Sequence, residues 1–276
     1  WTAGASALNL LAAIEPLSWK LLEKFRLDFE SVQAAHRGVR GARVECWARG
    51  VVHGVYCYDF KSAYPASYAD EPLGIGARPA RPGDEVGVWR CRWRWPHRDR
   101  IAPVLDQDTL AGAGWCEAWC IAEEIALLEE EGCQVQRLEG YAPEVIAPIG
   151  QTFVRELYGQ KEAGVFFAKV FLNSFHGKTS ERPVREAWSV GEKPTDWFGP
   201  EPVIVGPYWR CWEQNMDKAG KCPRHLQPIA AAQILGRTLA RLYRALRATA
   251  EAGGRVFYCD TDSVHCDLPP DAMRRA

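Results

Sequence analysis

Apolar residues recur along the chain with two different periods, and each period predicts its own kind of element. A spacing of three or four residues predicts helices, which we assign to residues 3–14, 17–35, 119–131, 153–175 and 228–250. The helix over 119–131 is expected to have an acidic outer face, and the stretch over 153–175 to break at Gly159 or Gly164. Short β-branched and aromatic runs predict strands, which we assign to residues 52–59, 86–95, 134–138, 255–258 and 264–266. No internal repeat appears among these elements.

The last two predicted strands enclose a turn that carries carboxylates. Asp260 and Asp262 are two residues apart in it, so both side chains are expected at the tip of a hairpin. Two Asp residues in a turn are more often solvated turn formers than metal ligands, so a metal site requires a third carboxylate. The strand over 52–59 supplies one, because it ends in Asp59 and Pro65 then prevents continued pairing. Carboxylates from neighbouring strands can bridge the two divalent ions that phosphoryl transfer to a sugar hydroxyl needs.

A predicted helix between these strands offers positive charge. Lys169 and Asn173 are four residues apart and therefore share a helix face, and Gly177 is a natural stop for that helix. A lysine on this face can hold phosphate groups as a point charge, whereas Lys61, in the turn after Asp59, is expected to face solvent. The same spacing also occurs on ordinary solvated helices, so the interpretation depends on all three elements together.

Three segments, in this order, resemble the polymerase motifs of family B DNA polymerases. Residues 59–65 resemble Asp-x-x-Ser-Leu-Tyr-Pro, residues 169–177 resemble Lys-x-x-x-Asn-Ser-x-Tyr-Gly, and residues 258–263 resemble Tyr-x-Asp-Thr-Asp-Ser. Residues 36–40 are similar to the Tyr-x-Gly-Gly-Arg segment of the protein-primed branch, found in phages, linear plasmids and some mobile elements. The resemblance implies an α+β fold, with a palm whose antiparallel sheet carries the catalytic carboxylates, and with helical fingers.

Three positions depart from the family pattern. His176 replaces a Tyr that helps to select the nucleotide, and His36 and Val39 replace the Tyr and the second Gly of the segment that touches the template strand. The departures weaken the template-strand assignment more than the catalytic one. The resemblance spans nearly the whole chain and is loosest between about residues 181 and 223.

The resemblance implies a template-directed DNA polymerase core that transfers deoxynucleotides to a 3′-hydroxyl with two Mg²⁺ ions, for which Mn²⁺ can substitute. Asp59 and Asp262 would bridge both ions. The Phe60 carbonyl would complete the shell of one ion, and Asp260 would be a weaker or outer ligand.

The resemblance also implies contacts with the nucleotide and DNA. Lys169 would neutralise the triphosphate with Arg155 or Lys161 as helpers, and Tyr64 would exclude a ribose 2′-hydroxyl. Further implied nucleotide contacts are Ser62, Ala63 and Asn173. Implied DNA contacts are Arg37, Gly38, Arg40, Ser174, Gly177, Lys178, Thr261 and Ser263.

The implied partners are a DNA primer-template and deoxynucleoside triphosphates, with a terminal protein as a candidate primer. We expect no membrane partner, because no run of residues is long and apolar enough to cross a bilayer and no signal peptide opens the chain. The expected location is the cytoplasm of a bacterial or phage-infected cell, in association with the nucleoid.

The domain organisation follows from the motif order. We expect a helical segment and template-contact loop over 1–50, a palm with a connecting insertion over 51–150, and fingers helices over 151–185. An insertion or loop over 186–225 and a palm helix with the catalytic hairpin over 226–276 complete the chain. Because the chain begins without Met and lacks an exonuclease domain and a thumb, it resembles the palm and fingers of a longer protein, and the isolated fragment could be inactive.

Composition is compatible with a globular core, but charge does not identify a DNA-binding protein. The 276 residues are 47% hydrophobic and 25% charged, with a net charge of −1. Many nucleic-acid binders are strongly basic, so positive charge must be local here. Two sets of arginines are candidate DNA contacts or solvated surfaces: Arg90, Arg92 and Arg94 on one strand, and Arg237, Arg241, Arg244 and Arg247 on one helix.

The ten cysteines contain no paired Cys-x-x-Cys knuckles, which favours reduced, buried thiols. Cys211, Cys222 and His225 could supply three zinc ligands, but no fourth is evident.

Two other classes of protein remain as alternatives. A polymerase-like module could bind DNA as a non-catalytic scaffold, although a scaffold need not keep Asp59, Lys169 and Asp262. Reverse transcriptases and nucleotidyl cyclases also have palms, but they lack the Lys-x-x-x-Asn-Ser helix between the carboxylate strands.

Overall fold

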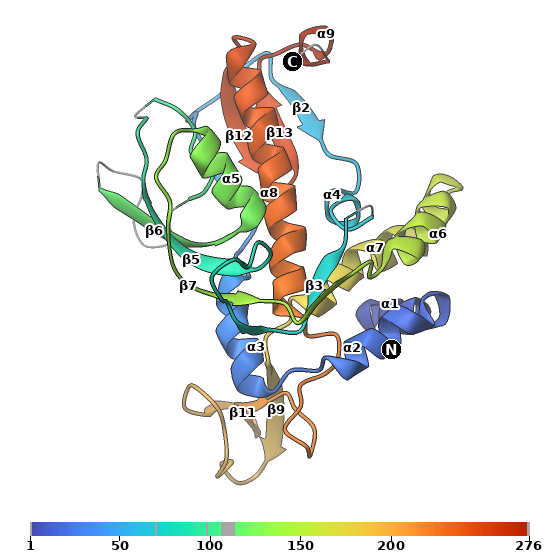
Figure 1. The fold of residues 1–276 in the computed structure, drawn as a ribbon. Coiled ribbons are helices and arrows are strands. Elements are labelled where there is room, and N and C mark those ends of the chain that lie inside the picture. Colours follow the sequence, from blue (N-terminus) through green and yellow to red (C-terminus); the bar gives the residue numbers. More distant parts are fainter. Residues whose placement is uncertain (1, 70, 98, 106–113, 275–276) are drawn as a thin grey trace.

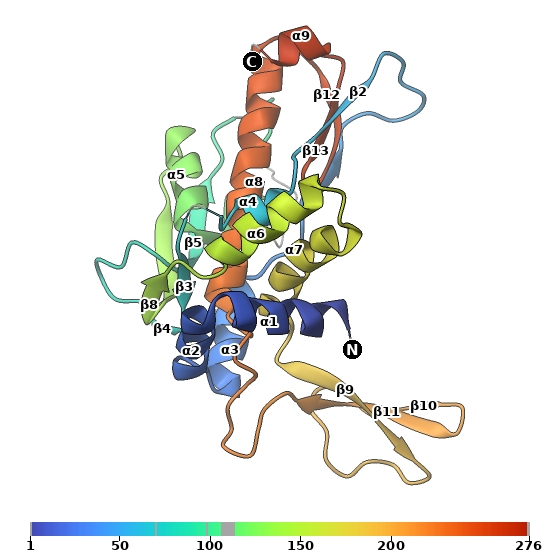
Figure 2. The same ribbon diagram turned by 90° about the vertical axis from the view of Figure 1, so that its right-hand side faces the viewer.

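A long helix runs through the middle of the fold and organises the elements around it (Figures 1 and 2). The computed structural model describes residues 2–69, 71–97, 99–105 and 114–274. The central helix is α8 (Pro228–Glu251), and most of its N-terminal half is buried on all sides. The sequence prediction of a helix over 228–250 is confirmed.

A four-stranded antiparallel sheet lies against the C-terminal half of α8, and we call it the central sheet. Its strands, in spatial order, are β1 (Val44–Cys46), β12 (Val256–Asp260), β13 (Ser263–Cys266) and β2 (Tyr56–Asp59). Leu242 and Leu246 of α8 pack on Cys259 and Val264, so one face of the sheet is buried.

The register of the central sheet brings its carboxylates together. Ser263, the first residue of β13, pairs with Asp59 of β2 on one side and with Asp260 of β12 on the other. The carboxylate-bearing ends of β2 and β12 therefore meet at the same end of the sheet.

A second layer covers the N-terminal half of α8. It contains an antiparallel sheet in the order β4 (Arg78–Pro79), β7 (Gln136–Ala142), β5 (Val88–Arg94) and β6 (Trp115–Ile121), together with α5 (Ala122–Glu130). The short pair β3 (Leu73–Ile75) and β8 (Val145–Ala147) joins it to the rest of the fold. Trp93 is fully buried between this sheet and α5, so the layer has a hydrophobic core of its own.

Two helices on the other side of α8 form a hairpin, which we call the helical hairpin. They are α6 (Gln151–Glu162) and α7 (Phe166–Thr179), joined at Gly164 with φ +84°. Helices α1 (Ala3–Ile14) and α2 (Pro16–Lys24) pack beside them, whereas α3 (Phe29–Ala35) and the 3₁₀ turn η1 (His36–Gly38) contact α8. The prediction of a break at Gly164 is confirmed, whereas Gly159 lies inside α6.

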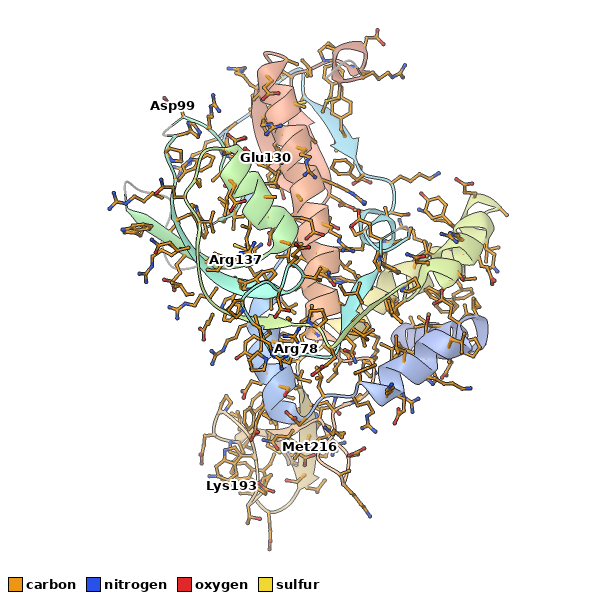
Figure 3. All side chains as sticks on the ribbon, viewed as in Figure 1. Arg78, Asp99, Glu130, Arg137, Lys193 and Met216 are labelled. Atoms are coloured by element: carbon orange, nitrogen blue, oxygen red, sulfur yellow. The ribbon has the colours of Figure 1, made fainter. Side chains whose placement is uncertain are left out.

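The remaining elements are a small sheet and two short helices. The sheet, which we call the arm, has three strands: β10 (Val203–Val205), β11 (Tyr208–Gln214) and β9 (Val184–Val190). The arm projects away from α8 and carries Lys193 near its outer end (Figures 2 and 3). The short helices α4 (Ala63–Ala66) and α9 (Pro270–Met273) follow β2 and β13 respectively.

The predicted helix over 17–35 is wrong, because the chain forms α2 and α3 with a break between them. Arg26 Nε donates to the Cys222 carbonyl at 2.9 Å, and the Cys222 amide donates to the Leu27 carbonyl at 2.9 Å. Asp28 then caps α3 by accepting a hydrogen bond from the Ser31 amide at 2.8 Å. The break is therefore fixed by a residue 196 positions away from Arg26 in the sequence, which local periodicity does not reveal.

The predicted helix over 119–131 begins too early. Trp119 to Ile121 complete β6 and pair with β5, and the helix starts at Ala122, where Glu124 accepts a hydrogen bond from the Ile121 amide at 3.1 Å. Glu124 is also buried, so the face of this helix is not uniformly solvated. Residues 186–225, predicted as an insertion or loop, contain most of the arm.

Smaller differences concern the ends of elements. The strand predicted over 52–59 begins at Tyr56, and the one predicted over 134–138 extends over β7. Gly177 does not stop α7, which continues to Thr179. In the described part of the chain, no helix is both long enough and apolar enough to cross a membrane.

Candidate active site

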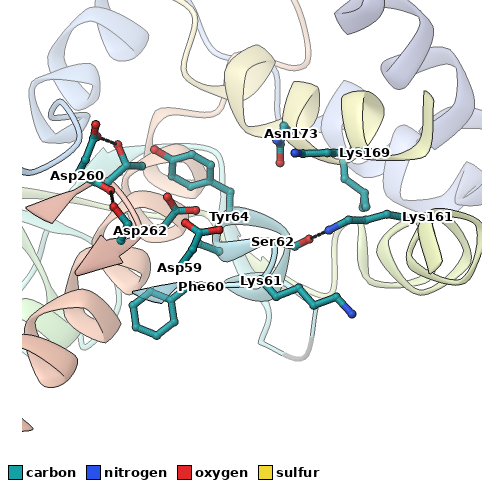
Figure 4. A pocket seen from close by; sticks show the side chains of 14 residues that line it. Asp59, Phe60, Lys61, Ser62, Tyr64, Lys161, Lys169, Asn173, Asp260 and Asp262 are labelled. Carbon is teal, nitrogen blue, oxygen red and sulfur yellow. Dashed lines mark hydrogen bonds between the residues drawn. The ribbon is translucent and has the colours of Figure 1, made fainter. Parts of the chain in front are cut away.

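A pocket of about 550 Å³ opens where the central sheet, α4 and the helical hairpin meet (Figure 4). It is lined from one side by the ends of β2, β12 and β13, and from the other by α6 and α7. The lining residues are Asp59, Phe60, Lys61, Ser62, Ala63, Tyr64, Lys161, Lys169, Leu172, Asn173, Asp260, Thr261, Asp262 and Ser263. All three sequence segments that suggested chemistry therefore contribute to one pocket.

Asp59 and Asp262 form the centre of the negative side of the pocket. The Phe60 amide donates to the Asp262 carbonyl at 2.9 Å, which ties the segment after β2 to the hairpin tip. Burial raises the pKa of the Asp262 carboxyl, and the charges of Asp59 and then Asp260 raise it further. Lys169 acts in the opposite direction. The carboxylates are therefore close enough to repel one another.

Asp260 is restrained by its own neighbours. One carboxylate oxygen accepts from the Tyr258 hydroxyl at 3.1 Å, and the other accepts from the Thr261 hydroxyl at 2.8 Å. Ser263 Oγ also donates to the Asp260 carbonyl at 3.1 Å. Each carboxylate oxygen therefore accepts one hydrogen bond, which restrains the side chain of Asp260.

Two residues beside the carboxylates have a left-handed backbone. Ser62 has φ 55° and Thr261 has φ 56°, and they are the two non-glycine residues with positive φ in the described ranges. Such conformations are unfavourable for residues with a Cβ and persist where the surrounding structure enforces them. The Thr261 amide donates to the Arg43 carbonyl at 2.8 Å, which holds the hairpin tip in this shape.

Three lysines supply the positive side of the pocket. Lys169 projects from α7 beside Asn173, as the predicted helix face requires (Figure 4). Lys161 Nζ, from α6, donates to Ser62 Oγ at 2.5 Å. Lys61 is exposed, as expected, but it also lines the pocket and forms an ion pair with Glu162 at 2.8 Å. Sequence reasoning missed this pair, because nothing in the local pattern connects Lys61 with Glu162.

Tyr64 lies on α4 with its ring half-buried at the pocket. Burial raises the pKa of its phenol, and the charges of Asp262 and Asp260 raise it further, so the hydroxyl stays protonated. The ring also stacks on His176 of α7, with centroids 4.4 Å apart and an angle of 23° between the planes.

Several predicted contacts lie outside this pocket. Arg155 is on α6 but does not line the pocket. Ser174 Oγ donates to the Val170 carbonyl at 2.7 Å, and Lys178 forms an ion pair with Glu181. The role of Arg155 in nucleotide binding and the roles of Ser174 and Lys178 in DNA binding stay predictions.

The predicted template-strand segment, residues 36–40, lies outside this pocket. Arg37 is exposed on η1, whereas Gly38 is buried, and a Cβ there would lie 2.8 Å from Val88 Cβ. Arg40 lines a smaller cavity and forms an ion pair with buried Glu124. Gly177 is exposed on α7, with open space where a Cβ would be.

The two arginine sets make contacts within the protein. Arg90 and Arg92 pair with Glu117, and the Arg94 guanidinium lies over the Trp115 ring at 4.7 Å. On α8, Arg237 forms ion pairs with Glu71 and Glu123. Arg241 donates a hydrogen bond to the Ala66 carbonyl, and Arg247 forms an ion pair with Glu131. Arg244 is exposed. Six of these seven arginines therefore have partners within the protein.

The cysteines show no sign of a metal centre in the part of the chain that is described. All ten are free thiols, and eight are buried. His225 Nε2 lies 3.1 Å from a Glu181 carboxylate oxygen. Among the described residues, no group of three or more His, Cys, Asp or Glu side chains is arranged to hold a metal ion.

Comparison with known proteins identifies the fold. No protein-family model and no curated protein sequence matches the chain. The chain is similar in structure to Phi29 DNA polymerase complexed with single-stranded DNA, with a TM-score of 0.69 and 17% identity over 96% of this chain and 47% of that chain. It is also similar to the ternary complex of that polymerase with primer-template DNA and incoming nucleotide. That match has a TM-score of 0.70 and 17% identity, and it covers 96% of this chain and 48% of that chain.

A third structure, the binary complex with primer-template DNA, gives a TM-score of 0.69 and 17% identity over 99% of this chain and 50% of that chain. The chain thus spans about half the length of these polymerases. At this identity the similarity shows the fold alone, which is a polymerase-like α+β fold as the sequence predicted.

Proposed function

We propose that the chain carries the nucleotidyl-transfer site of a template-directed DNA polymerase, of the protein-primed branch of family B. The observation that carries this proposal is the arrangement of the pocket, where Asp59 and Asp262 face Lys169 and Lys161. Carboxylates that gather cations and lysines that neutralise phosphates are the two charge sets that phosphoryl transfer needs. The similarity to Phi29 DNA polymerase, whose structures include primer-template DNA and incoming nucleotide, supports the proposal.

Asp59 and Asp262 are the pair that fits magnesium, since the described residues contain no group of three carboxylates arranged to hold an ion. Asp59 and Asp262 offer hard oxygen ligands, and their mutual repulsion would be relieved by a cation. The Phe60 carbonyl belongs to the same segment, and Asp260, restrained by hydrogen bonds to both oxygens, takes the weaker or outer role that the resemblance implies. Two carboxylates leave positions for water and phosphate oxygens, as Mg²⁺ prefers. Bound there, two Mg²⁺ or Mn²⁺ ions would supply charge stabilisation for the attacking and leaving oxygens.

The remaining residues of the pocket bind and orient the nucleotide in this proposal. Lys169 pairs with the triphosphate, and Lys161, held by Ser62, adds a second positive charge. Tyr64 closes the space that a ribose 2′-hydroxyl would occupy, and Asn173 shapes the pocket for the nascent base pair.

DNA and its partners complete the proposal. Thr261 and Ser263 line the pocket beside the carboxylates, where the primer end would lie. The primer-template and deoxynucleoside triphosphates are the proposed partners, and a terminal protein is the proposed primer in a bacterial or phage-infected cell. The alternative of a non-catalytic scaffold predicts DNA binding without nucleotide transfer.

A primer-extension experiment tests the proposal. The chain is incubated with a labelled primer-template, Mg²⁺ and one deoxynucleotide at a time, with each of the four template bases in turn. The proposal predicts extension that follows the template base. Binding of the primer-template without extension would support the scaffold instead.

A further inference from the structure

Tyr64 lies on an element that cannot by itself fix the direction of its ring. Helix α4 has four residues, and Ser62 before it has a left-handed backbone. Helices this short are not stable in isolation, because too few hydrogen bonds compensate the ordering of the backbone. The orientation of the Tyr64 ring must therefore depend on contacts with other elements.

His176 supplies such a contact from the helical hairpin. The two rings stack with centroids 4.4 Å apart and 23° between their planes. His176 follows Asn173 by three residues and Lys169 by seven, so it lies on the same face of α7 one turn farther along. Lys169 and Asn173 line the pocket, whereas His176 does not line it and stacks on Tyr64.

Both rings are neutral near pH 7. Burial lowers the pKa of His176 to about 4, and the pKa of Tyr64 is raised by burial and by Asp262 and Asp260. His176 Nδ1 is buried and has no hydrogen-bond partner in the described structure. An imidazole that makes no hydrogen bond through this atom contributes mainly its flat surface.

We propose that His176 is a positioning residue, which fixes the ring plane of Tyr64 and thereby sets the discrimination between deoxyribose and ribose. This inference rests on the proposed polymerase function. His176 acts through Tyr64 and does not touch the nucleotide. If shape alone matters, another flat ring at position 176 preserves the effect, and a small side chain abolishes it.

Kinetics with a ring-replacement series test the effect on sugar choice. The ratio of kcat/KM for a deoxynucleotide to that for its ribonucleotide is measured for His176→Ala, His176→Phe and Tyr64→Val. We expect His176→Ala to lower the ratio about tenfold by raising ribonucleotide use, and His176→Phe to keep it. Phe167→Ala, which removes an exposed ring from the same helix, is the matched control and should leave the ratio unchanged.

An unchanged ratio in His176→Ala, together with a lowered ratio in Tyr64→Val, would overturn the inference. An equal loss of kcat/KM for the deoxynucleotide and for the ribonucleotide in His176→Ala would also overturn it, because a purely structural role gives that result.

A second measurement does not depend on activity. The chain is labelled with ¹³C in its tyrosine rings, and the Tyr64 signal is assigned with Tyr64→Phe. Loss of the stacked ring in His176→Ala should shift this signal, and Phe167→Ala should not. The same Tyr64 signal in His176→Ala and in the unsubstituted chain would contradict the inference. If the unsubstituted chain incorporated no nucleotide, the proposed function would fail while this measurement still decided whether His176 positions Tyr64.

Discussion

Asp59 lies close enough to Asp262 for its negative charge to raise the pKa of the Asp262 carboxyl, in addition to the larger increase that burial causes. The two residues are contributed by β2 and the tip of the β12–β13 hairpin, which the register of the central sheet brings together. Concentrating negative charge in the folded state opposes folding, and a bound cation would reverse this effect.

This relationship predicts that Asp262→Asn stabilises the metal-free protein at neutral pH. Because the folded state raises the pKa of Asp262, it holds the proton more tightly than the unfolded state does. The destabilising effect is therefore complete above the folded-state pKa and disappears below the ordinary value of 3.8. In EDTA at pH 7 we expect a rise in Tm of about 2 °C, and no gain below pH 3.8.

Magnesium should change the difference in Tm between the unsubstituted chain and Asp262→Asn in favour of the unsubstituted chain. We expect Mg²⁺ to raise the Tm of the unsubstituted chain more than that of Asp262→Asn. Asp267→Asn is a control that should change the Tm in the opposite direction. Hydrogen bonds from Arg255 lower the pKa of Asp267, so removal of the Asp267 charge should lower the Tm at pH 7. Equal stabilisation of both proteins by Mg²⁺ would contradict the metal assignment.

The lysines should differ in their effects on nucleotide use. Lys169→Ala should raise KM and lower kcat, with a combined loss of about 100-fold, because its charge would meet the triphosphate as negative charge develops. Lys61→Ala should cost about fivefold or less, since Lys61 forms an exposed ion pair with Glu162. Steady-state kinetics at constant salt measure both. Equal losses would contradict the placement of the triphosphate along α7.

Glu15 should stabilise the helical hairpin through direct hydrogen bonds, although it lies far from the hairpin in sequence. Its carboxylate accepts hydrogen bonds from the amides of Gly150 and Phe153 at 2.8 Å each, at the N-terminus of α6. Glu15→Gln should therefore lower the free energy of unfolding by about 1–2 kcal/mol. Denaturant unfolding measures this, with exposed Glu156→Gln on α6 as the control. No difference between the two variants would show that this cap contributes nothing.

Local patterns predicted the elements that carry the pocket. The hairpin around Asp260 and Asp262, helix α8 and the shared face of Lys169 and Asn173 all depend on residues close in sequence. The break at Gly164 follows from its positive φ, which glycine adopts readily.

Long-range contacts could not be predicted in the same way. Lys61 and Glu162 are distant in sequence, as are Tyr64 and His176, and neither pair has a periodic signal. The guanidinium of Arg40, a predicted DNA contact, pairs with Glu124, and this pair exists only once α5 has packed. Tertiary packing, which a single sequence does not display, decides these positions.

The most direct measurement is single-turnover primer extension by Asp59→Asn and by the unsubstituted chain, with binding of the primer-template measured on the same samples. Asp59 is proposed to hold both metal ions, so its substitution should remove several kcal/mol of charge stabilisation from the transition state. We predict that Asp59→Asn binds the primer-template nearly normally and extends it at least about 1,000-fold more slowly. Extension by Asp59→Asn at a rate near that of the unsubstituted chain would contradict the account.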